Sequence, residues 1–160
     1  MLALNSQEID DAQSLRDFEH VSAEEILQWA FKNVSPDIAL ACSFQAESSV
    51  LIDMLYQLRG ADFRIFTLDT GRLNQETYDC MEALRQRYGI AIEVYFPAAE
   101  KVEQMVKAHG GILKINPLAD WTYKQVWDYI AAHELPHNKL HDRSFSSIGC
   151  APCTRAIKPW

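Results

Sequence analysis

No stretch of this sequence is apolar over the roughly 18 residues that a membrane-spanning helix needs. The N-terminal residues are polar and acidic, without the basic start and apolar centre of a secretory signal peptide. Positive charge is also scarce, because 15 lysines and arginines stand against 22 acidic residues and leave a net charge of −7. The sequence therefore predicts a cytoplasmic protein that binds neither membranes nor nucleic acid. An anionic ligand would have to be held by a few placed cations and backbone N–H groups.

Cysteine is sparse, with four residues in the chain, and without an export signal structural disulfides are not expected. Cys42 lies in an apolar run and Cys80 within a helical pattern, so each is predicted to be a buried, inert thiol. Cys150 and Cys153 have the Cys-x-x-Cys spacing, which can place two thiolates on one metal centre. Zinc, an iron–sulfur cluster and a redox disulfide all use this spacing, and the remaining alternative is two unrelated thiols in a loop. A zinc site would need two further ligands, for which His137 and His141 are candidates.

Strand and helix patterns alternate three times along the middle of the chain. Strands are predicted at 37–43, 63–68 and 90–96. A helix that ends at Gly60 follows the first strand, a helix from the cap Asn74 to Gly89 follows the second, and a helix at 98–108 follows the third. This order predicts the α/β class, with a mainly parallel twisted sheet and flanking helices.

Outside this alternation the patterns are shorter. Residues 1–20 are predicted to form a loose helical arm before a single domain over 21–160. Capping boxes at Ser22 with Glu25 and at Thr122 with Gln125 predict two further helices, and 112–115 reads as a strand.

Ligands of parallel sheets bind at the carboxyl ends of the strands, so the loops after Ser43 and Leu68 are the first candidates for a site. In the first loop, N–H groups at a helix start and serine hydroxyls would form an anion cradle. The alternative is a helix cap by Ser48 or Ser49. In the second loop, Asp69 could accept hydrogen bonds from a ligand and Arg72 could pair with a phosphate or sulfate. The alternative there is an ordinary turn with a solvated arginine.

Four segments in order resemble the assimilatory adenosine 5'-phosphosulfate (APS) and 3'-phosphoadenosine 5'-phosphosulfate (PAPS) reductases. These enzymes belong to the adenine-nucleotide α-hydrolase-like superfamily, whose fold is Rossmann-like. The segments are SFQAESSVLIDM (43–54), LDTGRLNQETY (68–78), INPLADWTYKQVWDYI (115–130) and LPHNKLHDRSFSSIGCAPCTR (135–155).

The resemblance implies roles for individual residues. The modified phosphate loop would comprise Ser43, Gln45, Ala46, Glu47 and Ser48, and the adenosine side would be lined by Leu68, Asp69 and Thr70. Cys150 and Cys153 would be two of the four ligands of a 4Fe–4S cluster, of which a mid-chain cysteine pair supplies the rest. The branch that carries this Cys-x-x-Cys is associated mainly with APS, whereas the PAPS branch typically lacks it.

The sequence also departs from the family. The family's adjacent cysteine pair follows the stretch that resembles Lys107–Gly110, but here Gly110 leads directly into 111–117, which in the family lies much further on. We therefore expect a missing segment near 110–111. The family's C-terminal tail, with a Glu-Cys-Gly-Leu motif that carries the nucleophile, has no counterpart before Trp160. No catalytic residue is assigned within this chain.

The family reaction reduces APS to sulfite and AMP through a cysteine thiolate, and thioredoxin or a similar dithiol is the reductant. The resemblance implies this activity, although we expect the 160-residue chain itself to be inactive and to hold no stable cluster. PAPS reduction, an ATP-using relative of the superfamily, and a non-catalytic nucleotide- or metal-binding remnant are the alternatives. Assembly into a homo-oligomer is left open.

Overall fold

The computed structural model describes residues 2–3, 21–34, 38–96, 112–113 and 115–157. The chain falls into two compact units, of which the first comprises Met1–Leu40 and Ala98–Asp120, and the second Ala41–Pro97 and Trp121–Trp160. Every candidate site residue belongs to the second unit. No helix in the described part of the chain is long and apolar enough to cross a membrane.

The first unit contains helix α1 (Ala23–Val34). Its predicted capping box is confirmed, because the Ser22 N–H donates to the Glu25 carboxylate at 2.9 Å and the Glu25 N–H donates to the Ser22 hydroxyl at 3.2 Å. Acidic residues in the first turn of this helix also interact favourably with the positive end of its dipole.

A two-stranded antiparallel sheet joins β1 (Leu2–Ala3) to β5 (Ile112–Leu113). The predicted strand at 112–115 is thus found over its first two residues. The prediction of a helical arm is wrong for Leu2 and Ala3, because pairing with a strand distant in sequence overrides a weak local pattern. The rest of that arm and the predicted helix at 98–108 lie outside the described residues.

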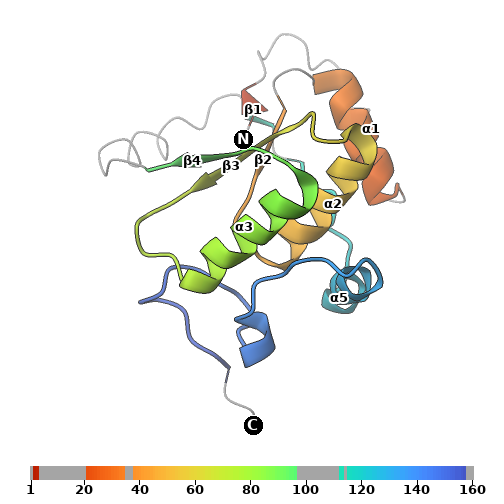
Figure 1. The fold of residues 1–160 in the computed structure, drawn as a ribbon. Helices are drawn as coiled ribbons and strands as arrows, with labels where there is room; N and C mark the ends of the chain where they lie inside the picture. Colours follow the sequence, from red (N-terminus) through yellow and green to blue (C-terminus); the bar gives the residue numbers. More distant parts are fainter. Residues whose placement is uncertain (1, 4–20, 35–37, 97–111, 114, 158–160) are drawn as a thin grey trace. The chain divides into compact units, whose positions relative to one another are not determined.

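The central sheet has the strand order β2-β3-β4, with β2 at Ala39–Ala41, β3 at Arg64–Leu68 and β4 at Ile92–Tyr95. Strands β3 and β4 run parallel, in the register Ile65 to Ile92, and lie side by side in Figure 1. The strands that contain Ala39 and Ile65 are adjacent. Directly after β2, the Cys42 N–H donates to the Phe66 carbonyl at 2.8 Å.

Helices follow the strands in the predicted order: α2 (Ala46–Arg59) after β2 and α3 (Gln75–Tyr88) after β3. Gly60 and Gly89 end these helices with φ of 62° and 61°, the left-handed region that glycine adopts without a steric penalty. The α/β prediction is confirmed by this alternation.

The predicted cap of α3 is wrong in its chemistry. Asn74 does hold the N-cap position, but its side chain makes no capping hydrogen bond and donates instead to the Gly149 carbonyl at 3.4 Å. A partner 75 residues away has displaced the local one. Helix α5 (Tyr123–Ala132) begins with the predicted capping box of Thr122 and Gln125, and a short 3-10 helix, η2 (His141–Arg143), follows.

The core of the second unit consists of apolar side chains from β3, α2 and α3. Ile65, Val50, Ile52 and Leu84 are completely shielded from solvent, and Phe44 of the loop before α2 joins them. Burying each such side chain contributes roughly 1.5–3 kcal/mol relative to exposure. This packing fixes the start of α2 against the sheet.

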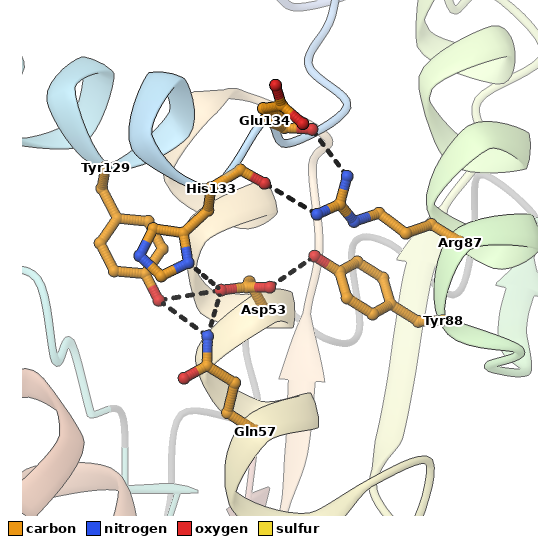
Figure 2. Close-up of polar contacts among 7 residues, drawn as sticks. All are labelled: Asp53, Gln57, Arg87, Tyr88, Tyr129, His133 and Glu134. Carbon is orange, nitrogen blue, oxygen red and sulfur yellow. Dashed lines mark hydrogen bonds and ion pairs between the residues drawn. The ribbon is translucent and has the colours of Figure 1, made fainter.

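A polar network built on Asp53 connects three helices (Figure 2). The buried Asp53 carboxylate of α2 accepts hydrogen bonds from Gln57 at 2.6 Å, from the Tyr88 hydroxyl of α3 at 2.7 Å and from the Tyr129 hydroxyl of α5 at 2.9 Å. The His133 ring, stacked on Tyr129, brings Nδ1 to within 3.4 Å of the same carboxylate. These donors compensate the desolvation of a buried charge.

Candidate functional site

The first candidate loop turns sharply between β2 and α2. Phe44 has a φ of 56°, which is costly for a residue with a Cβ, and its side chain is 1% exposed. Burial of the ring holds the backbone in this left-handed conformation. The turn leaves Ser43 exposed on the surface and directs the chain into α2 at Ala46.

The start of α2 has no side-chain cap. Gln45 holds the N-cap position without a capping hydrogen bond, and Ser48 and Ser49 lie inside the helix and are buried. The helix-cap interpretation of these serines is therefore wrong. The first-turn N–H groups of Ala46 and Glu47 have no partner within a helix, and together with the helix dipole they form a positive end suited to an anion.

The second candidate loop is shaped by Asp69. Its carboxylate is 5% exposed and accepts hydrogen bonds from the Gly71 N–H at 2.7 Å and from the Tyr78 hydroxyl at 2.9 Å. The hydrogen bond to Asp69 raises the pKa of Tyr78. Asp69 thus has the turn-forming role that was the alternative to ligand binding, and a ligand could use only its remaining lone pairs. Leu68, Thr70 and Arg72 are exposed around it.

A small hollow of about 10 Å³ lies between the two loops. Phe44 of the first loop and Asp69 of the second line it, together with Thr67, Leu73, Tyr78 and Val94. Its walls are largely apolar, and its free space is about that of one water molecule. The sequence did not indicate Phe44, Leu73 or Tyr78, because an aromatic or aliphatic residue beside a turn carries no signal of its own.

The third segment, Ser147–Thr154, is bonded to both loops. The Gln45 side-chain oxygen accepts hydrogen bonds from the Ser147 hydroxyl at 3.3 Å and from the Ile148 N–H at 3.4 Å. The Ala151 N–H donates to the Arg72 carbonyl at 2.7 Å. The structure therefore brings together all three segments that the sequence analysis singled out, across about a hundred residues of chain.

The cysteines do not fit a 4Fe–4S cluster, which normally takes four thiolates. Cys150 and Cys153 lie near the surface in one turn, but Cys42 and Cys80 are buried. Desolvation raises the pKa of Cys42 to about 11 and that of Cys80 to about 12, so both are protonated thiols at neutral pH. Within the described ranges no three potential metal ligands cluster together.

The histidines proposed for zinc are also engaged elsewhere. His137 is hydrogen-bonded to the Asp142 carboxylate at 2.9 Å, and His141 Nδ1 contacts the Phe145 carbonyl at 2.8 Å. Both rings pack edge-on against the Trp127 indole. They stabilise the turn around η2 and form no ligand group with the cysteines among the described residues.

Comparison with known proteins identifies relatives over most of the chain. The family model of the phosphoadenosine phosphosulfate reductase domain matches residues 37–112 and 98–156. The adenosine 5'-phosphosulfate reductase of Staphylococcus haemolyticus is 32% identical over 189 residues, covering 84% of this chain and 77% of the relative. Adenosine 5'-phosphosulfate reductase 2 of Bacillus subtilis is 32% identical over 185 residues, covering 81% of this chain and 78% of the relative.

Solved structures confirm the fold. The phosphoadenylyl-sulfate reductase of Candida auris, in a phosphate complex, superposes with a TM-score of 0.80 at 21% identity, covering 96% of this chain and 99% of the other. Yeast FAD synthetase in complex with FAD gives 0.61 at 14% identity, covering 80% of this chain and 62% of the other. The adenine-nucleotide α-hydrolase-like fold predicted from the sequence is therefore correct.

Proposed function

Because the chain belongs to the phosphoadenosine phosphosulfate reductase domain family, we propose that it serves APS reduction in sulfate assimilation as the nucleotide-binding part of the reductase. The substrate is APS rather than PAPS, since the relatives at 32% identity are named adenosine 5'-phosphosulfate reductases. The products are sulfite and AMP, and the reductant is a thioredoxin-type dithiol in the cytoplasm. The observation that carries the proposal is the convergence of both loops and the segment Ser147–Thr154.

Different residues of the site bind different parts of the nucleotide. The positive end of α2, at Ala46 and Glu47, receives the phosphate, and the exposed Arg72 guanidinium pairs with the phosphosulfate. The adenosine part lies along Leu68, Asp69 and Thr70, which lie at the carboxyl end of β3. Asp69 acts by holding the turn that presents Thr70 and Arg72, and Ser43 and Ser48 complete the loop.

The reaction needs a thiolate that attacks the sulfate sulfur, so that the bond from sulfur to the phosphate oxygen breaks and AMP leaves. A dithiol then attacks the resulting S-sulfocysteine at the cysteine sulfur, releases sulfite and becomes a disulfide. Cys42 and Cys80 cannot be this nucleophile, because burial shields them and keeps them protonated. The chain supplies nucleotide binding, and no step runs through a cluster that its cysteines do not fit.

A missing internal block explains why the chain supplies nucleotide binding although its cysteines do not fit a cluster. The family model matches the chain twice, and the two matches share residues 98–112, where the sequence analysis expects the gap near 110–111. The alignment with the Staphylococcus relative runs over 189 residues but covers 84% of a 160-residue chain, so the relative has many residues with no counterpart here. Both findings support the proposal that a block near 110–111 is absent.

Calorimetric titration of the purified chain with APS and with AMP tests the proposal. We expect both to bind at one site, and adenosine to bind more weakly because it lacks the anion that α2 would hold. PAPS is the comparison ligand, and tighter binding of PAPS than of APS would reverse the choice of substrate. If a chain that unfolds cooperatively binds none of these nucleotides, it is a non-catalytic remnant of the family and the proposal fails.

A further inference from the structure

The turn between Cys150 and Cys153 is closed by hydrogen bonds. The Cys153 and Thr154 N–H groups donate to the Cys150 carbonyl at 3.0 and 3.2 Å. The Thr154 hydroxyl donates to the same carbonyl at 3.0 Å and accepts from the Gly149 N–H at 2.9 Å. A turn of this kind holds its first and fourth Cα atoms within about 7 Å, which is the separation that a disulfide can span.

The two thiols belong to one closed turn and are within reach of solvent. Pro152 fixes one backbone dihedral inside the turn, which reduces the entropy lost on closing a ring. Cys150 is partly exposed and Cys153 exposed, so an external oxidant can reach them, unlike Cys42 and Cys80.

We propose that Cys150 and Cys153 form a reversible disulfide with each other, and that its formation loosens the contacts of this turn with Gln45 and Arg72. The turn reaches Arg72 through the Ala151 N–H and reaches Gln45 through Ser147 and Ile148. Ring closure between Cys150 and Cys153 changes the backbone of Ala151, which lies inside the ring, whereas Ser147 and Ile148 precede it. Its effect on nucleotide affinity rests on the proposed function; formation of the disulfide does not.

The oxidant is a low-molecular-weight disulfide such as glutathione disulfide. The Cys153 thiolate attacks one of its sulfurs, forms a mixed disulfide and releases one thiolate. The Cys150 thiolate then attacks the Cys153 sulfur and releases the second. The protein loses two protons and two electrons, and the oxidant is reduced to two thiols. A dithiol reductant reverses both steps.

The test begins with the reduced chain and a chromogenic disulfide reagent that counts accessible thiols. We expect two fast thiols before treatment with glutathione disulfide and none afterwards, with Cys42 and Cys80 reacting only in denaturant. Peptide mass mapping should show Cys150 linked to Cys153 with the loss of two hydrogen atoms. A stable glutathione adduct on Cys153, or no oxidation at all, would overturn the disulfide.

Two measurements test whether the disulfide changes the contacts of the turn with Gln45 and Arg72. Amide hydrogen exchange at Ala151 should be faster in the oxidised chain, whether or not a nucleotide binds. The affinity for AMP should fall by about threefold to tenfold on oxidation, the effect of one or two lost hydrogen bonds. In the double variant Cys150→Ser/Cys153→Ser neither quantity should respond to glutathione disulfide. Equal affinity and equal exchange in both forms would overturn the coupling, whereas AMP binding by neither form, with altered exchange, would refute only the proposed function.

Discussion

The Tyr88 hydroxyl donates a 2.7 Å hydrogen bond to Asp53, and this bond ties the last residue of α3 to the middle of α2 (Figure 2). The same carboxylate accepts from Tyr129 of α5, so a single acidic side chain connects three helices. Arg87 strengthens the link, because its guanidinium donates to the carbonyl oxygens of His133 and Glu134 at 2.8 and 2.7 Å. The network holds α5 against the helices whose N-terminal ends carry the candidate site.

The first prediction concerns stability. Asp53→Ala should lower the free energy of unfolding by about 2–4 kcal/mol, because it removes the acceptor of the buried Tyr88 hydroxyl and of the part-buried Tyr129 hydroxyl. Tyr88→Phe removes one donor and should cost about 1–2 kcal/mol. Urea unfolding followed by circular dichroism measures both. Asp128→Ala is the control, since Asp128 forms an exposed pair with Lys124 and should change stability by less than about 0.5 kcal/mol. Equal losses in Asp53→Ala and Asp128→Ala would contradict the assigned role of the network.

The second prediction concerns alkaline pH. Folding raises the pKa of Cys42 from 9.0 to about 11 and that of Cys80 from 9.0 to about 12. The unfolded chain therefore loses these protons first, so their contribution to stability is complete below pH 9 and is lost as the pH rises through 11 and 12. Each thiol should add a slope of at most about 1.4 kcal/mol per pH unit in that window.

Thermal unfolding between pH 8 and pH 11 measures this effect. Cys80→Ala should reduce the dependence on pH, whereas Cys153→Ser, which changes an exposed thiol, should leave it almost unchanged. A midpoint that stays constant across the range in the unmodified chain would show that the buried thiols do not govern alkaline stability.

The parts of this fold that the sequence predicts depend on neighbours within a few residues. The capping boxes at Ser22 and Thr122, the glycine ends of α2 and α3 and the positions of both candidate loops all follow from local patterns. Their determinants are backbone hydrogen bonds that close within one helical turn.

The missed features depend on partners distant in sequence. Asp53 lies on a helix and meets Tyr88 and Tyr129 at separations of 35 and 76 residues. The Asn74 side chain donates to the Gly149 carbonyl, 75 residues away, instead of capping its own helix. When a side chain has several possible hydrogen-bond partners, the tertiary structure determines which of them it contacts.

The third prediction compares two arginines at opposite ends of β3. Arg72 follows the carboxyl end of the strand, and Arg64 begins it in an exposed pair with Glu93. Arg72→Ala should weaken binding of APS by about tenfold or more, since it removes a charge-assisted contact to the phosphosulfate. Arg64→Ala makes the same chemical change away from the proposed site and should leave the affinity within about twofold. Calorimetry measures the affinity of both variants for APS. If Arg72→Ala and Arg64→Ala bind APS equally well, Arg72 is not part of the site.

The last prediction is that this 160-residue chain neither holds a stoichiometric 4Fe–4S cluster nor reduces APS at a useful rate. A cluster normally takes four thiolates, and of the four cysteines present two are buried and protonated. The remaining pair lies in one closed turn bonded to Arg72 and Gln45, without the freedom to leave the site, accept a sulfo group and meet a dithiol reductant. Anaerobic reconstitution with iron and sulfide, followed by iron counting and a sulfite-release assay with thioredoxin, measures both. A full cluster together with steady sulfite release would show that the inferred missing block is not needed, and Cys153→Ser would then identify whether this exposed thiol is the nucleophile.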